Sequence, residues 1–122
     1  MKIKESGENY LETILLLGEK NGFVRSIDVA TELNYTKASV SRAIGILKRE
    51  EYIIIKENGQ ILFTEKGRKK AEAVYERHRV IADFLVNALG VDEKTAQEDA
   101  CHIEHIISQK SFDAIKNFNS GK

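Results

Sequence analysis

Apolar side chains recur at helical spacing near the start of the chain. Between residues 6 and 18 the apolar positions fall on one side of a helix: Tyr10, Leu11, Ile14, Leu15 and Leu17. Such a stripe predicts an amphipathic helix. Ser6 is its expected N-cap, and Asn21-Gly22 is the expected turn that follows it. Asn9 and Glu12, three residues apart, share another strip of the same helix.

Two shorter helices are predicted next, over residues 27–33 and 37–50. Ser26 and Thr36 are their expected N-caps, because a hydroxyl at this position accepts a bond from an otherwise unpaired backbone N–H. The residues expected to be buried are Ile27, Ala30 and Leu33 in the first helix and Val40, Ile44 and Leu47 in the second. Two short helices joined by a three-residue turn are typical of a helix-turn-helix, although ordinary helical hairpins look similar.

A predicted β-hairpin after these helices favours the DNA-binding interpretation. Tyr52–Lys56 is rich in β-branched residues, the turn Glu57–Gln60 contains Asn-Gly, and Ile61–Phe63 returns. A helix-turn-helix followed directly by a small hairpin is the winged-helix arrangement. Its second helix would enter the major groove and the hairpin would touch the flanking DNA backbone.

The rest of the chain predicts a helical domain. Thr64 is expected to cap a long helix over residues 65–89, whose apolar stripe is close to heptad spacing and suggests packing against a second copy. A further helix is expected over 93–107, with Ser111 capping a short final turn. The predicted fold is therefore mainly α with a small β-hairpin wing: a winged helix-turn-helix over residues 1–70 and a helical dimerisation domain over residues 71–122.

Composition narrows the function only slightly. The 122 residues carry 19 basic and 19 acidic side chains, and the single cysteine cannot form an internal disulfide. No signal peptide is expected before the first helix, and no apolar run approaches the roughly 20 residues that span a bilayer. The sequence therefore predicts a cytoplasmic protein.

A group of metal-binding side-chain types lies in the second half. Cys101, Glu104 and His105 stand at i, i+3 and i+4, so a helix projects a thiol, a carboxylate and an imidazole from one face. His78 lies inside the apolar stripe of the long helix. These are side-chain types that bind divalent transition metals. His102 lies about 100° around the helix from Cys101 and is expected in solvent.

Each of these residues also has an ordinary structural interpretation. A histidine in an apolar stripe is often a hydrogen-bonded core residue, and a lone cysteine is often a small buried hydrophobe. A thiol enzyme would use the same residue types. No glycine-rich oxyanion loop is visible, however, and a fold this small leaves little room for a substrate cleft. We therefore do not expect an enzyme.

Several motifs, in order along nearly the whole chain, resemble the diphtheria-toxin-repressor family of metal-dependent transcriptional repressors, which includes the manganese transport regulators. They are Glu8-Asn9-Tyr10-Leu11-Glu12, Arg77-His78-Arg79 with Phe84-Leu85, Gly90-Val91-Asp92, and Asp99-Ala100-Cys101-His102-Ile103-Glu104-His105. The resemblance implies a homodimer that binds a palindromic DNA operator when metal is bound and so controls iron or manganese homeostasis. A winged-helix regulator without metal dependence is the alternative.

The resemblance also implies site residues. The candidate metal ligands are Asn9, Glu12, His78, Cys101, Glu104 and His105, for Fe²⁺ or Mn²⁺, with Co²⁺, Ni²⁺ and Zn²⁺ also possible. The candidate DNA-binding residues of the winged helix are Thr36, Lys37, Ser39, Ser41, Arg42, Lys56, Asn58 and Gln60.

The chain departs from both types of family member. Manganese-type members have acidic residues at the positions of Asn9 and Cys101. Iron-type members have a sulfur residue and a cysteine there. The second metal site of iron-type members uses a carboxylate and a histidine where this chain has Ala82 and Gln97.

Overall fold

The computed structural model describes residues 5–121, with side chains from residue 7. The chain divides into two compact units, Met1–Glu72 and Ala73–Lys122, and the helix α4 (Glu65–Asn87) continues from the first into the second. The observed elements are mostly helices with one two-stranded antiparallel hairpin, which confirms the predicted fold class. Within residues 5–121, no helix is both long and apolar enough to cross a membrane.

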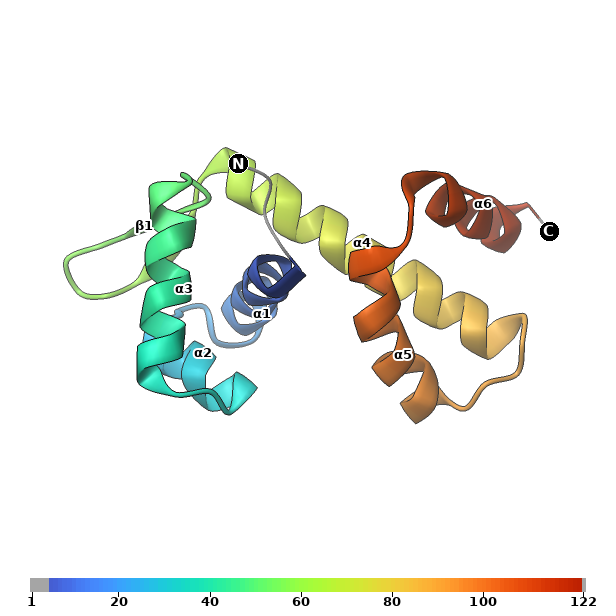
Figure 1. Ribbon diagram of the computed structural model, residues 1–122, viewed down its shortest axis with the longest axis horizontal. Helices are drawn as coiled ribbons and strands as arrows, with labels where there is room; N and C mark the ends of the chain where they lie inside the picture. Colours follow the sequence, from blue (N-terminus) through green and yellow to red (C-terminus); the bar gives the residue numbers. More distant parts are fainter. Residues whose placement is uncertain (1–4, 122) are drawn as a thin grey trace. The chain divides into compact units, whose positions relative to one another are not determined.

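The first unit is built on three helices, α1 (Glu5–Asn21), α2 (Ser26–Leu33) and α3 (Lys37–Arg49), which pack against one another (Figure 1). Their buried faces meet in a core that includes Leu11, Ile14, Val29, Val40, Ile44 and Leu47, all 2% exposed or less. In α2 the buried residues are Val29 and Ala30, so the prediction that Ile27 is buried was wrong: its side chain is 46% exposed. Burial of such side chains stabilises the unit by roughly 1.5–3 kcal/mol each. The predicted helix-turn-helix is therefore present.

Helix ends in this unit differ from three predictions. Helix α1 already includes Ser6, so Ser6 is not its N-cap, and α1 continues to Asn21 rather than ending near Gly18. Helix α2 is capped at Arg25 instead of Ser26, because the Asp28 carboxylate accepts a bond of 2.9 Å from the Arg25 backbone N–H. Thr36 caps α3 as predicted, with its hydroxyl oxygen accepting from Ser39 N–H at 3.1 Å.

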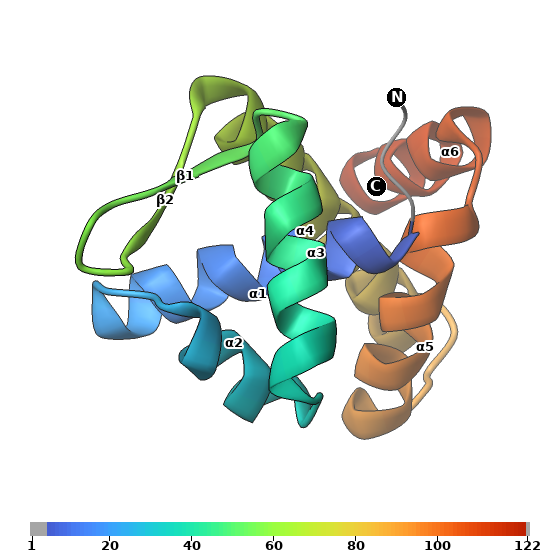
Figure 2. The same cartoon turned by 60° about the vertical axis from the view of Figure 1, so that its left-hand side comes forward.

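The wing consists of β1 (Ile53–Ile55) and β2 (Ile61–Phe63), paired antiparallel with Ile54 opposite Leu62. Gly59 has φ +88° in the turn, a conformation that suits glycine. The hairpin extends beyond α3 (Figure 2), and a bond of 2.8 Å from Ile61 N–H to Val24 O attaches β2 to the segment before α2.

A close backbone approach joins the wing to α4. The Thr64 hydroxyl accepts from Gly67 N–H at 3.0 Å and so caps α4 as predicted. It also lies 2.7 Å from the carbonyl oxygen of Glu51, to which it donates. Gly67 is buried so closely against the wing that a Cβ there would lie 1.8 Å from the backbone oxygen of Tyr52. Only glycine fits this position.

The second unit consists of the later part of α4 with α5 (Glu93–Ile106), which crosses α4 at a steep angle, and α6 (Gln109–Ser120) (Figure 1). Ile81, Ala82, Ala100 and Phe112 form its buried core. Helix α4 ends at Asn87, two residues before the predicted end. The predicted cap at Ser111 was wrong: Ser108 caps a longer helix by accepting from Ser111 N–H at 3.1 Å.

Asp92 caps α5, the helix that carries three of the predicted ligands. Its carboxylate accepts from Thr95 N–H at 3.0 Å, and this bond lowers the pKa of the Asp92 carboxyl. A carboxylate with a lowered pKa stabilises the folded state fully above its ordinary pKa and less as pH falls through the lowered value. The cap is therefore complete at neutral pH.

Candidate metal centre and DNA-binding surface

Helices α4 and α5 bring three predicted ligands of the second unit together. His78 on α4 and Glu104 on α5 are joined by a contact of 2.8 Å between Nδ1 and Oε1. His105, next in sequence to Glu104, places Nε2 at 3.2 Å from the other carboxylate oxygen, Oε2. The side chain of His105 is 3% exposed and that of Glu104 is fully buried. One carboxylate thus lies between two imidazoles.

One oxygen of the Glu104 carboxylate lacks the hydrogen bond that such burial requires. Among the described residues its Oε2 accepts no hydrogen bond, although His105 is close. An unpaired buried charge lowers the stability of the folded state by several kcal/mol. A bound cation removes this cost. Metal–ligand distances of about 2.1 Å place neighbouring donor atoms roughly 3 Å apart, close to both observed separations. The donor set therefore fits a divalent cation.

Two further side chains hold this cluster from outside. His78 Nε2 lies 2.6 Å from Oε1 of Gln97, whose Nε2 donates to Glu93 at 2.7 Å. Arg77, next to His78, donates from Nη1 to the backbone oxygens of Glu104 at 3.1 Å and Ile107 at 3.2 Å. The Arg77 guanidinium thereby satisfies carbonyls at the end of α5, which have no partner within the helix.

Sequence reasoning missed these outer residues. Gln97, Cys101 and Glu104 stand at i, i+4 and i+7 on α5, so a helical projection places Gln97 on the ligand-bearing face. That signal was available. Nothing in the sequence indicated that Arg77 would reach the end of α5, because the contact joins residues 27 positions apart.

Three further ligand candidates, Asn9, Glu12 and Cys101, are placed on α1 and α5. Cys101 is exposed on α5, and His102 is exposed as expected. In the first unit, α1 carries Glu12, which is buried at 6% exposure, and Asn9, which is partly exposed. The Asn9 backbone oxygen accepts from the Thr13 hydroxyl at 2.9 Å.

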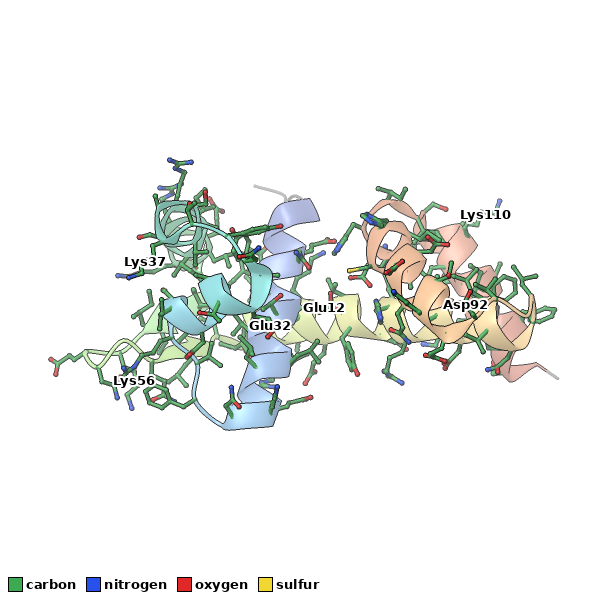
Figure 3. All side chains as sticks on the ribbon, turned by 90° about the horizontal axis from the view of Figure 1, so that it is seen from below. Glu12, Glu32, Lys37, Lys56, Asp92 and Lys110 are labelled. Carbon is green, nitrogen blue, oxygen red and sulfur yellow. The ribbon has the colours of Figure 1, made fainter. Side chains whose placement is uncertain are left out.

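The predicted DNA-binding side chains lie on the exposed side of α3 and on the wing. Lys37, Ser39, Ser41 and Arg42 are exposed, whereas Val40, Ile44 and Leu47 face the core. Lys37 and Lys56 lie on the same side of the first unit (Figure 3). A hollow of about 340 Å³ between α2 and α3 is lined by Ser26, Ile27, Ala30, Lys37, Val40 and Ser41.

Several of the candidates already make local hydrogen bonds. The Thr36 hydroxyl caps α3, and Asn58 Oδ1 accepts from Gln60 N–H at 3.0 Å in the turn of the wing. Their exposed neighbours Lys37, Arg42 and Lys56 are cations, the side-chain type that contacts DNA phosphates.

Two family models together cover almost the whole chain. Residues 2–61 match the N-terminal DNA-binding domain of the iron-dependent repressor. Residues 64–120 match the metal-binding and dimerisation domain of the same protein.

Individual relatives agree with these models. An uncharacterised HTH-type transcriptional regulator of Methanocaldococcus jannaschii is 36% identical over 95% of this chain and 94% of its own length. The HTH-type transcriptional regulator MntR of Bacillus pumilus is 34% identical over 90% of this chain and 76% of its own length. In the solved structure of the manganese regulator SloR, 25% identical with a TM-score of 0.83, this whole chain matches 56% of that chain.

These matches decide between the classes of protein that the sequence left open. The family consists of transcriptional regulators, which overturns the thiol-enzyme alternative. Its second domain binds metal and forms dimers, which is consistent with the buried carboxylate between two imidazoles in the second unit. The chain belongs to the iron-dependent repressor family of metal-dependent, DNA-binding transcriptional repressors.

Proposed function

We propose that this protein is a metal-activated repressor that works in the cytoplasm as a homodimer, binds a palindromic operator and controls iron or manganese homeostasis. The observation that carries the metal part is Glu104, a fully buried carboxylate that lies between His78 and His105 and has an oxygen without a hydrogen bond in the described part of the chain. The DNA part rests on the exposed cations of α3 and the wing.

The proposed ligands come from both units. His78, Glu104 and His105 form the part of the set in the second unit, Cys101 is on the same helix, and Asn9 and Glu12 are the candidates from α1. Glu12 supports this assignment because it is a buried carboxylate, and carboxylate oxygens bind divalent cations. Bound there, a divalent cation would place positive charge beside Glu104, whose Oε2 accepts no hydrogen bond among the described residues.

Ligands from separate units also explain how metal controls DNA binding. If α1 and the second unit both supply ligands to one metal ion, metal binding favours the conformations in which both sets of ligands reach the ion. A ligand shifts such an equilibrium only by its difference in affinity between the two states. We propose that the favoured arrangement places the two recognition helices of the dimer roughly 34–36 Å apart, one turn of DNA.

The choice of metal depends on Cys101. Carboxylate oxygens suit Mn²⁺, whereas a thiolate favours Fe²⁺, Co²⁺, Ni²⁺ or Zn²⁺. Among the similar proteins, MntR is a relative in sequence and SloR is a structural match. SloR is a manganese regulator. This chain has a cysteine on α5, so we propose that it accepts Fe²⁺ as well as Mn²⁺.

Cobalt spectroscopy tests the ligand set. Co²⁺ bound to wild-type protein should give a strong near-ultraviolet charge-transfer band from the Cys101 thiolate, and Cys101→Ser should remove the band. Serine has a similar size, so the fold is expected to remain. A band that is absent from the Co²⁺-loaded wild type, or that survives in Cys101→Ser, would show that Cys101 is not a ligand.

Helix α3 is proposed to read the major groove. Lys37, Ser39, Ser41 and Arg42 would meet bases and phosphates, and Lys56, Asn58 and Gln60 would contact the flanking backbone. Thr36, at the start of α3, is proposed to contact DNA with them, and its hydroxyl also caps the helix by accepting from Ser39 N–H. The exposure of these α3 side chains opposite the buried stripe supports the assignment.

We expect Arg42→Ala to weaken operator binding without affecting metal binding. Loss of a phosphate contact should lower the salt dependence of log Kd by about one unit and raise Kd by about tenfold. Fluorescence anisotropy at several salt concentrations measures both. Lys110→Ala is the control, because it also removes one exposed cation but lies on α6. An unchanged affinity and salt dependence for Arg42→Ala would exclude this face of α3.

A further inference from the structure

A chain of polar contacts continues from the candidate metal centre to the surface of the second unit. Glu104 Oε1 lies 2.8 Å from Nδ1 of His78, and Nε2 of the same ring lies 2.6 Å from Gln97 Oε1. The Gln97 amide nitrogen then donates to Glu93 Oε2 at 2.7 Å. Both nitrogens of His78 therefore have a polar partner, one buried and one exposed.

The far end of this chain determines the roles of the atoms in it. A carboxylate can only accept, so the Gln97 group that faces Glu93 must be the NH₂ group. The Gln97 carbonyl oxygen then faces His78 and accepts the hydrogen on its Nε2. This leaves Nδ1, on the side of the buried Glu104, as the His78 atom that can bind a cation. Gln97 and Glu93 therefore determine that Nδ1, and not Nε2, is free of hydrogen.

Gln97 itself is poorly placed to replace His78 as a ligand. Its oxygen is already bonded to the His78 ring, and the residue is exposed, whereas Glu104 is fully buried. Metal-ligating histidines commonly donate their second ring N–H to an oxygen, and loss of such a partner weakens metal binding about 10- to 100-fold. Because water can partly replace an exposed amide, the lower end of that range applies here.

We propose that Gln97, held by Glu93, is a positioning residue that fixes the ring of His78 with Nε2 protonated and presents Nδ1 to the metal. This inference rests on the proposed function, because it requires His78 to be a ligand. The role of Gln97 would thus be to orient one ligand, His78. The metal-site geometry would depend on Gln97 although Gln97 does not touch the metal.

The test uses full-length Gln97→Leu, which keeps much of the side-chain volume and removes the hydrogen bonds. Co²⁺ affinity, measured by competition with a chelator, should fall about tenfold, and the visible Co²⁺ spectrum should change as the His78 ring becomes free to turn. In Zn²⁺-loaded wild type, long-range ¹H–¹⁵N NMR should show His78 with Nδ1 bound to metal and Nε2 carrying hydrogen. In Gln97→Leu that Nε2 hydrogen should exchange faster with solvent.

Three controls keep the inference separate from folding and from the proposed function. Asn117→Leu makes the same change from amide to apolar side chain on α6 and should leave Co²⁺ affinity within about twofold of wild type. Glu93→Gln keeps an acceptor for the Gln97 amide, so its Co²⁺ affinity should fall less than that of Gln97→Leu. His78→Ala should lose far more. If His78→Ala binds Co²⁺ like wild type, the proposed metal site fails and this inference fails with it. If His78→Ala is impaired but Gln97→Leu has wild-type affinity and spectrum, or Nε2 is the metal-bound atom, only the role of Gln97 is wrong.

Discussion

Glu104→Gln should abolish metal-dependent DNA binding while leaving the metal-free protein folded. The amide has the shape of the carboxylate but no charge, so His78 and His105 keep a polar neighbour while the cation loses its buried anionic ligand. Removing one partner of a buried charge pair costs about 3–5 kcal/mol. Metal affinity should therefore fall by roughly 100- to several-thousand-fold.

The same substitution should not destabilise the metal-free protein, because it removes a fully buried charge with an unbonded oxygen. We expect the free energy of unfolding without metal to stay within about 1 kcal/mol of wild type or to rise. Glu98→Gln, an exposed change of the same kind on α5, is the matched control and should behave like wild type. Metal affinity of Glu104→Gln within about threefold of the control would exclude Glu104 as a ligand.

Gly67→Ala should cause the largest loss of stability among single substitutions in the first unit. The added methyl would lie 1.8 Å from the Tyr52 backbone oxygen and 2.7 Å from its carbonyl carbon. No rotamer change relieves a clash with backbone, so the start of α4 must separate from the wing and the Thr64 cap must distort. Overpacking usually costs about 1–3 kcal/mol, and a backbone clash lies at or above the upper end. The melting temperature should fall by roughly 12 °C or more.

Gly45→Ala is the matched control for this prediction. Gly45 is exposed on α3 with no side chain or distant backbone within 4 Å of the added Cβ. Alanine there should stabilise the helix by about 0.5–1 kcal/mol. Urea unfolding of both variants measures the difference. A Gly67→Ala protein as stable as wild type would contradict the close packing between the wing and α4.

Local patterns predicted the helices and the wing well, because each depends on residues near in sequence. Thr36, Thr64 and Asp92 precede helices whose stripes were visible. The errors lie at the ends. Arg25 is the cap of α2 because Asp28 supplies the carboxylate from inside the helix, and Ser108 rather than Ser111 caps α6. Which of two nearby polar residues becomes the N-cap depends on the local backbone geometry, and residue preferences for helix ends do not determine it.

The site was predictable only in part. Periodicity placed His78 inside the stripe of α4, and spacing placed Glu104 and His105 on one helix. Neither pattern showed that the Glu104 side chain would be fully buried. Spacing grouped Cys101 with Glu104, whereas the thiol is exposed. The outer contacts of Gln97 and Arg77 join separate helices, so they follow from tertiary packing. For the same reason the sequence did not reveal the approach of Gly67 to Tyr52.

The most direct test of metal-activated repression is the affinity of the wild-type protein for one DNA duplex with and without metal. The duplex would be selected from a random library with Mn²⁺-loaded protein, and Kd measured by fluorescence anisotropy at fixed ionic strength. We predict at least about tenfold tighter binding with Mn²⁺ or Fe²⁺ than with EDTA, and an equal gain in metal affinity when DNA is bound. The same Kd in EDTA and in saturating metal would contradict metal activation and support a winged-helix regulator without metal dependence.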